Sequence, residues 1–418
     1  MKMDALTGGI HSCACGKDHS CPIDHVVIGA DTASVLPQLC DKYERILLVS
    51  DENTWEIWGK TICAVLESKI ETNLILTPNG EVVIPNEEKI AEIETAVTAN
   101  TDLIIGVGSG VINDLCKISS FRHNLPYFIA ATAPSMDGYA SVGAALILDG
   151  MKITLNARPP KAILADTEIL KNAPMEMLRA GYGDILGKYS CLNDWQLSAL
   201  LFDEYFCQTV YDLTMDAVKK VESLADGIVS RDGEAVKALM EALVIVGIAM
   251  AYVGTSRPAS GSEHHLSHFF EITGILDQTP YLMHGIDVAY SSIVTASLRE
   301  KIVAAKPHPH TFDRAAWEKE IRRLYSSVSD GVIALQDKLG WYERDDYAVV
   351  CEKWNAVKAL LQEAPSAAET RAMMERVGMD FSEFESLYGA QKIADAVLYA
   401  KDLKDRYSVL WLWYQYVA

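Results

Sequence analysis

LIIGVGSGVIND, residues 103–114, is the stretch of sequence that decides the fold. An apolar run of residues runs directly into a glycine-rich turn, and the turn opens a helix. Glycine lets the backbone approach a ligand closely, and a helix N-terminus offers N–H donors, so the pattern is typical of a phosphate cradle. Val111 stands where the common G-x-G-x-x-G pattern has its third glycine. A tight strand–helix turn that binds no ligand is therefore the alternative interpretation.

Short β-rich runs alternate with amphipathic segments on both sides of this turn. Alternation of strand and helix predicts a parallel, doubly wound sheet, and we place this Rossmann-like α/β domain at residues 24–167. An Asp149-Gly150 dipeptide predicts a β-hairpin between residues 144–148 and 152–155, inserted before the last strand. The predicted strands are 26–28, 46–50, 74–77, 103–107, 127–131 and 162–164.

Strand signals fade after residue 167, and long stretches with helical apolar periodicity replace them. We therefore expect an all-helical C-terminal domain at residues 168–418. The segments that read as helices are 170–173, 180–199, 234–252, 286–303 and 347–363.

The charge and the apolar patterning of the sequence limit the classes of partner that the protein can have. The 418 residues carry 37 basic and 57 acidic side chains, a net charge of −20, which argues against nucleic acid or an anionic membrane as the main partner. The first residues lack the apolar segment of a secretory signal, and the longest apolar run, 242–254, is too short to span a bilayer. We expect a cytoplasmic protein without a membrane span.

The N-terminal residues 1–23 form a separate Cys/His-rich tail. Cys13, Cys15 and Cys21 lie among His11 and His19, and such a tract can bind a soft metal. The segment lacks the paired C-x-x-C spacing of a structural zinc site. A disordered tail with reduced thiols is the alternative.

Two polar features follow predicted strands, where ligands of a doubly wound sheet bind. The loop after residues 127–131 reads Thr132-Ala-Pro-Ser135-Met-Asp137-Gly138. Asp51 ends the strand at 46–50, a position from which an acid accepts hydrogen bonds from the adenosine ribose. Capping of the helix that follows is an equally good reading of Asp51.

One carboxylate and a histidine cluster are candidate metal ligands. We expect Asp184, in Gly181-Tyr-Gly-Asp184, to open a helix. Ser262-Glu-His264-His-Leu-Ser-His268 holds three of the ten histidines, and His264 and His268 share a helical face. His284 precedes a further helix. One Asp and two His with open positions suit Zn²⁺, Ni²⁺ or Fe²⁺, whereas structural histidines are the alternative.

At these residues the sequence resembles the sn-glycerol-1-phosphate dehydrogenases, members of the superfamily that holds glycerol dehydrogenase, iron-containing alcohol dehydrogenases and dehydroquinate synthase. Five motifs in the same order carry the resemblance, which spans residues 25–300. They are G-x-G-S-G-x-I-x-D (106–114), T-A-P-S-x-D-G (132–138), G-x-G-D-x-L-G-K (181–188), S-R-P-A-S-G-x-E-H-H-x-S-H (256–268) and H-G (284–285).

The resemblance implies reversible, NAD(P)-dependent reduction of dihydroxyacetone phosphate to sn-glycerol 1-phosphate, with one Zn²⁺ or Ni²⁺ ion. It implies metal ligation by Asp184, His264 and His284. Asp184 would thereby meet the substrate, as would Asp137 and the catalytic candidate His268. A homo-oligomer, with the homodimer as one form, is expected. The cofactor residues implied are Asp51, Gly108, Gly110, Val111, Ile112, Asn113, Asp114, Thr132, Ser135 and Ser141.

Several points stay open at the level of sequence. The residues do not separate Zn²⁺ from Ni²⁺. Lys161, Lys188 and Arg257 are candidates for the substrate phosphate because they neighbour the motifs. Glycerol dehydrogenase is the closest alternative activity. Dehydroquinate synthase is disfavoured, since it typically has Glu at the position of Asp184, and a non-catalytic metal or nucleotide sensor is a further alternative.

Overall fold

A computed structural model describes residues 3–78, 80, 82–148 and 151–418. The chain divides into two compact units. The first unit comprises Met1–Ile185 and Lys219–Thr255, and the second comprises Leu186–Val218 and Ser256–Ala418. The division therefore differs from the one expected after residue 167, because two long helices that follow the sheet in sequence belong to the first unit.

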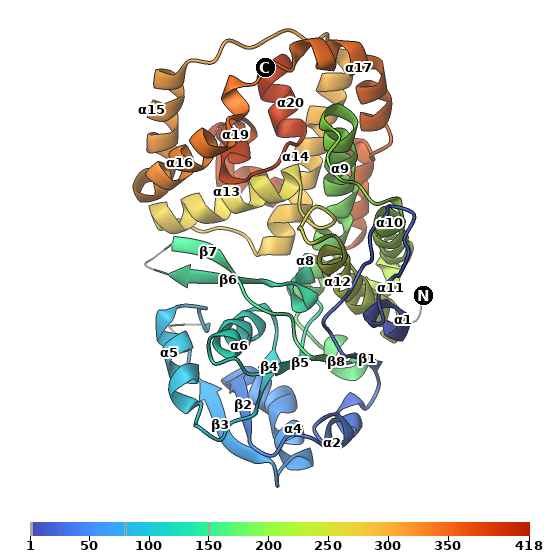
Figure 1. The fold of residues 1–418 in the computed structure, drawn as a ribbon, viewed down its shortest axis with the longest axis vertical. Helices are drawn as coiled ribbons and strands as arrows, with labels where there is room; N and C mark the ends of the chain where they lie inside the picture. Colours follow the sequence, from blue (N-terminus) through green and yellow to red (C-terminus); the bar gives the residue numbers. More distant parts are fainter. Residues whose placement is uncertain (1–2, 79, 81, 149–150) are drawn as a thin grey trace. The chain divides into compact units, whose positions relative to one another are not determined.

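A six-stranded, all-parallel sheet forms the centre of the first unit (Figure 1), in the order β1-β8-β5-β4-β2-β3. All six predicted strands are present, although β3 begins earlier than expected. The strands are β1 (His25–Gly29), β2 (Ile46–Asp51), β3 (Ile70–Leu76), β4 (Leu103–Gly108), β5 (Tyr127–Ala131) and β8 (Ala162–Asp166).

The strand order places a topological switch point between β2 and β4. The chain leaves β2 toward the edge strand β3, then returns past β2 to β4 and continues to β5 in the same direction. The connections after β2 and β4 therefore lie on opposite faces of the sheet, with α4 below and α6 above in Figure 1. Ligands of such sheets bind at the crevice that this divergence opens at the carboxyl ends of the strands.

Helices and one hairpin complete the first unit. Asn86 caps α5 by accepting a hydrogen bond from Lys89 N at 3.1 Å, as its position before an acidic first turn predicts. The predicted hairpin is confirmed as β6 (Gly143–Leu148) and β7 (Met151–Asn156), an antiparallel pair. Its predicted turn, Asp149-Gly150, lies outside the described residues. The helical elements are α1 (Met3–Thr7), η1 (Thr32–Val35), α2 (Leu36–Leu39), α3 (Glu52–Thr54), η2 (Trp55–Gly59), α4 (Lys60–Val65), α5 (Glu87–Ala96), α6 (Gly110–Arg122), η3 (Asp137–Ala140), α7 (Thr167–Leu170), α8 (Met175–Leu186), α11 (Ala225–Val229) and α12 (Gly233–Val253).

Helix α12 is longer than the apolar run that the sequence analysis singled out. Among the described residues, it is the one helix whose length and composition would let it cross a membrane. Its most apolar window is 67% buried inside the protein, which is the pattern of a core helix. It packs on η3, α7, α1 and β1 of its own unit.

Every regular element of the second unit is helical, as expected. The helix predicted at 180–199 is two helices, α8 and α9, because the helical hydrogen-bonding pattern is interrupted at Gly187. The helix predicted at 170–173 lies slightly earlier in the sequence and is α7. The elements are α9 (Lys188–Phe202), α10 (Gln208–Ser223, which crosses the division), α13 (Ser262–Asp277), α14 (His284–Ala304), α15 (Arg314–Tyr325), η4 (Ser326–Val328), α16 (Ser329–Leu339), η5 (Trp341–Glu343), α17 (Tyr347–Leu361), α18 (Ala367–Arg376), α19 (Phe381–Tyr399), η6 (Ala400–Leu403) and α20 (Val409–Tyr416).

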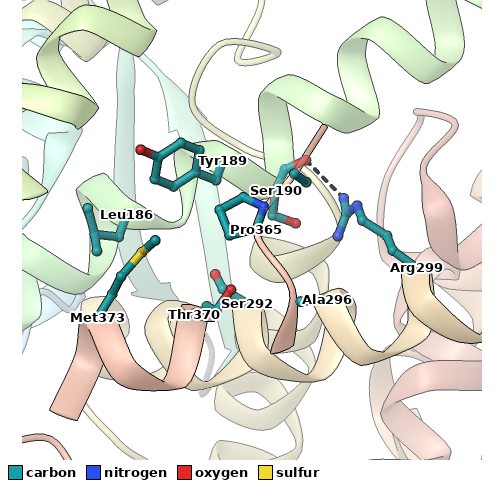
Figure 2. Close-up of a pocket in the computed structure, with 10 residues that line it drawn as sticks. Leu186, Tyr189, Ser190, Ser292, Ala296, Arg299, Pro365, Thr370 and Met373 are labelled. Atoms are coloured by element: carbon teal, nitrogen blue, oxygen red, sulfur yellow. Dashed lines mark hydrogen bonds between the residues drawn. The ribbon is translucent and has the colours of Figure 1, made fainter. Parts of the chain in front are cut away.

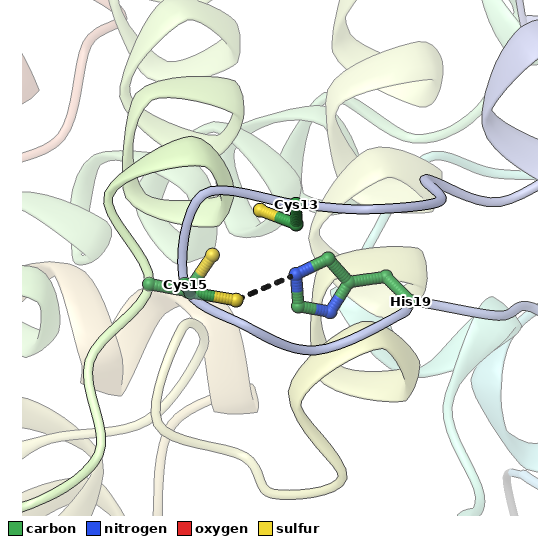
Figure 3. A group of neighbouring side chains, drawn as sticks. Cys13, Cys15 and His19 are labelled. Carbon is green, nitrogen blue, oxygen red and sulfur yellow. Dashed lines mark hydrogen bonds between the residues drawn. The ribbon is translucent and has the colours of Figure 1, made fainter.

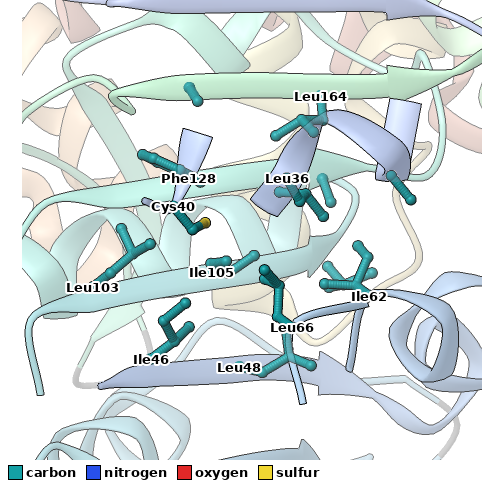
Figure 4. Close-up of a cluster of buried hydrophobic side chains, with 14 of the residues drawn as sticks. Leu36, Cys40, Ile46, Leu48, Ile62, Leu66, Leu103, Ile105, Phe128 and Leu164 are labelled. Carbon is teal, nitrogen blue, oxygen red and sulfur yellow. The ribbon is translucent and has the colours of Figure 1, made fainter. Parts of the chain in front are cut away.

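A cluster of apolar side chains on one face of the sheet packs against α2 and α4 (Figure 4). Alternate residues of the four central strands β8, β5, β4 and β2 point into it, such as Ile46 and Leu48 of β2 or Leu103 and Ile105 of β4. The intervening residues are also buried, which explains why these strands read as continuous apolar runs rather than as alternating ones.

Replacement of Ile105 by Ala should lower the free energy of unfolding by about 2–5 kcal/mol, because it leaves a cavity at a fully buried position. The measurement is the urea midpoint of the first unit's transition. Ile57→Ala, at a residue 53% exposed, is the matched control and should change it little. Equal midpoints for the two variants would contradict this packing.

Candidate functional site

The N-terminus of α6 presents backbone donors at the switch point. The first helical hydrogen bond runs from Asn113 N to Ser109 O at 3.0 Å. The N–H groups of Gly110, Val111 and Ile112 therefore have no acceptor within the helix. A side chain at Gly108 would lie 2.5 Å from the side chain of Ile112, so glycine is required for this tight entry into the helix. The geometry is that of a phosphate cradle.

Asp51 lies next to this turn, since β2 and β4 pair up to Ser50 and Val107. Its Oδ1 accepts a hydrogen bond from Thr54 N at 2.7 Å, and the Thr54 hydroxyl accepts one from Asp51 N at 3.0 Å. Asp51 thus forms a capping box for α3. The capping and ribose interpretations are compatible, because a carboxylate has a second acceptor oxygen.

Asn113 and Asp114 are turned into the protein rather than toward the cradle. Asn113 is fully buried and donates to Asp114 Oδ1 at 3.0 Å. Asp114 Oδ2 accepts from Ala145 N of β6 at 3.0 Å. Burial raises the pKa of Asp114 and lowers that of Lys117, one turn further along α6. Asp114, which is itself held by Asn113, therefore ties α6 to strand β6 of the hairpin.

Lys117 is a residue that sequence reasoning missed. Its ammonium group is fully buried and donates to the carbonyl oxygens of Gly138 at 2.8 Å and Gly143 at 2.7 Å. The Ser141 hydroxyl donates to the same Gly138 oxygen at 3.0 Å. Lys117 therefore fixes the end of the loop that follows β5. The available signal was its i, i+3 spacing from Asp114.

The loop after β5 lies beside the glycine-rich turn. Thr132 N donates to Gly108 O at 3.1 Å, and a side chain at Gly110 would lie 3.1 Å from Met136 Cε. Thr132, Ser135 and Asp137 are between 7% and 9% exposed. The structure therefore brings together, within the first unit, the two motifs that the sequence analysis assigned to the cofactor.

Asp184 is held against this loop by a close helix contact. It lies in the last turn of α8, so the expectation that it opens a helix is wrong. A Cβ at Gly181, one turn earlier, would lie only 1.9 Å from Pro134 O, so α8 can approach the loop only through glycine. The approach lets Asp184 Oδ2 accept a hydrogen bond from Asp137 N at 2.9 Å.

Three histidine rings meet in the second unit. The ring of His264 lies 5.2 Å from that of His284 and 6.3 Å from that of His268, between centroids, and His268 lies 5.7 Å from His284. A ring nitrogen of His264 and one of His284 are within 4.8 Å of each other. His265 is fully buried away from this group, and burial holds its pKa well below the usual range.

Glu263 fixes the ring of His264, a role that the sequence analysis did not assign. Its Oε1 accepts hydrogen bonds from Gly261 N at 2.9 Å and from His264 Nδ1 at 2.7 Å. A carboxylate oxygen that accepts from Nδ1 leaves Nε2 as the unprotonated nitrogen, which is the state that binds a metal. The signal in the sequence was the Glu-His dipeptide at the start of a helix.

A buried polar network holds the start of α13 against α9 and α14. Asp194 Oδ2 accepts from Ser262 N at 2.7 Å, and Asp194 Oδ1 accepts from Arg299 at 3.0 Å. Arg299 also donates to Ser190 O at 3.0 Å, at the edge of a small pocket lined by residues of α9, α14 and α18 (Figure 2). Because the guanidinium is committed to these partners, we read the pocket as part of the scaffold rather than as an anion site.

The three cations proposed for the substrate phosphate are occupied elsewhere. Lys161 precedes β8, at the amino end of the sheet, and donates to Asp24 at 3.3 Å. Arg257 is 4% exposed and pairs with Glu204. Lys188 is fully buried and donates to Ala259 O at 3.0 Å. Proximity in sequence to the motifs was therefore a poor guide to these side chains.

Comparison with known proteins agrees with the fold. The family described as iron-containing alcohol dehydrogenase matches residues 27–174. The solved structure of glycerol dehydrogenase from Schizosaccharomyces pombe is similar with a TM-score of 0.56 and 18% identity, over 88% of this chain and 92% of that one. The doubly wound sheet with its helical partner unit is thus the fold of the iron-containing alcohol dehydrogenase class.

Relatives at higher identity define the family within this class. A glycerol-1-phosphate dehydrogenase [NAD(P)+] of Halalkalibacterium halodurans is 32% identical, over 78% of this chain and 90% of the relative. One from Geobacillus stearothermophilus is 34% identical, over 76% of this chain and 82% of the relative. The chain belongs to the glycerol-1-phosphate dehydrogenase family.

Replacement of Gly181 by Ala should push α8 away from the Pro134 carbonyl and break the Asp137–Asp184 hydrogen bond. We expect a lower melting temperature together with loss of bound divalent metal, measured by mass spectrometry of the dialysed protein. Gly331→Ala is the matched control, because its new methyl group has open space in helix α16. A Gly181→Ala protein with full metal content would refute the proposed importance of this contact.

Proposed function

We propose that this protein is a metal-dependent oxidoreductase that uses NAD(P) to interconvert dihydroxyacetone phosphate and sn-glycerol 1-phosphate. Membership of the glycerol-1-phosphate dehydrogenase family supports the reaction, and the chain spans 90% of one relative that carries this name with [NAD(P)+]. The observation that carries the proposal is the meeting of His264, His268 and His284 on two helices.

The metal ligands in this proposal are Asp184, His264 and His284. The donor chemistry fits a divalent transition metal: an imidazole whose Nδ1 is held by Glu263, a second imidazole, and a buried carboxylate. Two nitrogens and one oxygen suit Zn²⁺ or Ni²⁺ equally. A divalent ion bound there supplies Lewis-acid polarisation of the substrate's ketone oxygen.

The N–H groups of Gly110, Val111 and Ile112 bind the pyrophosphate of the dinucleotide in this proposal, with Gly108 allowing its close approach. Asp51 accepts hydrogen bonds from the adenosine ribose, which favours NAD, because a 2′-phosphate would be repelled. Thr132, Ser135 and Ser141 offer hydroxyl groups to the cofactor. Asn113 and Asp114 do not point toward the cofactor in this proposal but hold helix α6 in place.

Two side chains act on the substrate in this proposal. Asp137 accepts a hydrogen bond from a substrate hydroxyl, while its N–H group orients Asp184. His268 lies beside the two histidine ligands and is partly exposed, so it can deliver the proton that the new hydroxyl group of the product requires. NAD(P) supplies the hydride.

The cellular location and the oligomeric state are inferred from the sequence. We infer a cytoplasmic enzyme that works as a homo-oligomer, with a homodimer as the simplest form. A net charge of −20 supports a small-molecule substrate rather than nucleic acid. Light scattering of the purified protein tests the oligomeric state.

Alanine at Asp184 or His264 should remove both bound metal and turnover, because each residue is assigned as a ligand. Alanine at His268 should keep the metal, reduce kcat and alter its pH dependence, because that residue is assigned to proton transfer. His123→Ala, on an exposed histidine, is the control. Stoichiometric metal in Asp184→Ala, or an unchanged pH profile in His268→Ala, would contradict the respective assignment.

Glycerol dehydrogenase is the alternative activity, favoured by the similar fold of the Schizosaccharomyces pombe enzyme. The two activities differ in the substrate phosphate. We expect a far higher kcat/KM for sn-glycerol 1-phosphate than for glycerol, measured with NAD and with NADP. A preference for unphosphorylated glycerol would establish the alternative.

A further inference from the structure

The N-terminal segment, which the sequence analysis treated as a separate tail, is folded in the structure. Ile10 and His19 form an antiparallel bridge, with hydrogen bonds of 2.9 Å and 2.8 Å between their backbones. Within it, Ser12 N donates to Asp18 Oδ1 at 2.7 Å and Gly16 N donates to Cys13 O at 2.9 Å. Residues 10–19 are thus a closed loop with fixed ends.

Three soft ligands converge inside this loop (Figure 3). The sulfur atoms of Cys13 and Cys15 and a ring nitrogen of His19 lie within 4.8 Å of one another. Cys13 is 9% exposed and His19 is fully buried. Both cysteines are thiols rather than disulfide partners. The Cys/His-rich sequence left open a soft-metal site or a disordered tail, because the loop closure that brings His19 to the cysteines depends on tertiary structure.

The protonation state of His19 is set by its backbone partner. Its Nδ1 lies 2.8 Å from Tyr252 O, and a carbonyl oxygen can only accept, so Nδ1 carries the proton. Nε2 therefore carries the lone pair, and it lies 3.4 Å from Cys15 Sγ. His19 thus donates from Nδ1 to a backbone carbonyl and directs Nε2 at thiols, which is the arrangement of a histidine that ligates a metal.

The spacing of these atoms also fits a tetrahedral ion. Zn–S bonds of about 2.3 Å and Zn–N bonds of about 2.05 Å, at tetrahedral angles, separate sulfur and nitrogen by roughly 3.6 Å. The separation of Cys15 Sγ and His19 Nε2 is 3.4 Å. All three donor atoms lie within 4.8 Å of one another, so the loop already gathers them around one point.

The loop is anchored on the core of the first unit. Tyr252, near the end of α12, accepts the His19 hydrogen bond through its carbonyl, stacks its ring on His19 at 5.5 Å, and donates its hydroxyl to Leu6 O. A metal in the loop would therefore fasten α1 and the chain leading into β1 to the buried helix α12. Such a role is structural and separate from the histidines of the second unit.

We propose that Cys13, Cys15 and His19 form a second metal site, which binds a soft divalent cation, Zn²⁺ in the first instance. Two thiolates and one imidazole provide three of the four ligands that Zn²⁺ prefers, and the fourth position takes a water molecule or a further protein donor. The site clamps the N-terminal segment and takes no part in hydride transfer. It is independent of the proposed function, since it uses none of the residues assigned to catalysis.

The full-length protein tests the site without any substitution. Titration of the chelated protein with Co²⁺ should produce the intense near-ultraviolet absorption of thiolate-to-cobalt charge transfer. Added Zn²⁺ should abolish that absorption by displacing the cobalt. X-ray absorption of the zinc-loaded protein should show sulfur ligands as well as nitrogen. A cobalt spectrum without thiolate bands would overturn the proposal, because the catalytic ligands contain no sulfur.

Variants then separate the two sites. Cys13→Ser/Cys15→Ser and His19→Ala should each lose one metal ion per chain and the thiolate bands. Turnover per folded molecule should persist, while limited trypsin digestion at the exposed Lys17 should become faster. Cys21→Ser and His11→Ala, in the same segment but outside the cluster, are the matched controls. His264→Ala should lose the catalytic ion and keep the thiolate bands.

Two results would contradict this assignment. One is wild-type metal content in the double cysteine variant. The other is loss of the thiolate bands in Cys21→Ser with their retention in Cys13→Ser/Cys15→Ser. Failure of the proposed dehydrogenase activity would leave the second site intact, because its readouts are metal content, absorption and proteolysis.

Discussion

The contact between the backbone of α8 at Gly181 and the carbonyl of Pro134 is the constraint on which the rest of the site depends. Any side chain at Gly181 would overlap that oxygen, so helix and loop can meet in this way only if residue 181 is glycine. The meeting turns the N–H group of Asp137 to Asp184, and Lys117 fixes the far end of the same loop through two carbonyl groups. One close approach therefore orients the carboxylate that we assign to the metal and the loop that we assign to cofactor and substrate.

Buried polar groups orient the histidines in a similar way. Glu263 holds Nδ1 of His264, and Asp194 holds the backbone at Ser262, with Arg299 compensating its charge. Removing any one of these groups would leave a buried partner unsatisfied, which costs more than an ordinary hydrogen bond contributes. A precise ring orientation is thus maintained by residues that need not touch the substrate.

The sequence predicted well what local pattern controls. All six strands of the sheet, the hairpin and the helical character of the second unit follow from periodicity, turn residues and caps such as Asn86. Grouping of His264, His268 and His284 was also predicted, because i, i+4 spacing and a helix start restrict where the rings can lie. The family assignment came from motifs that lie in both units.

What the sequence could not predict depends on contacts between distant residues. Asp184 was expected to begin a helix, since acidic residues favour that position, yet it lies in the last turn of α8, which ends just before Gly187. Glu263 and Lys117 gain their roles only from partners that folding brings to them. The candidate phosphate ligands Lys161 and Arg257 were misjudged for the same reason, as Asp24 and Glu204 already hold them. Cys13, Cys15 and His19 likewise became a cluster only through the closure of their loop.

The most direct test of the central claim is steady-state reduction of dihydroxyacetone phosphate by the chelated protein, with NADH or NADPH, before and after addition of Zn²⁺ or Ni²⁺. The account predicts negligible turnover of the chelated protein, restoration by one of these ions, and sn-glycerol 1-phosphate as the product. Full turnover in the continued presence of chelator, or no reduction of this substrate by the metal-loaded protein, would contradict it.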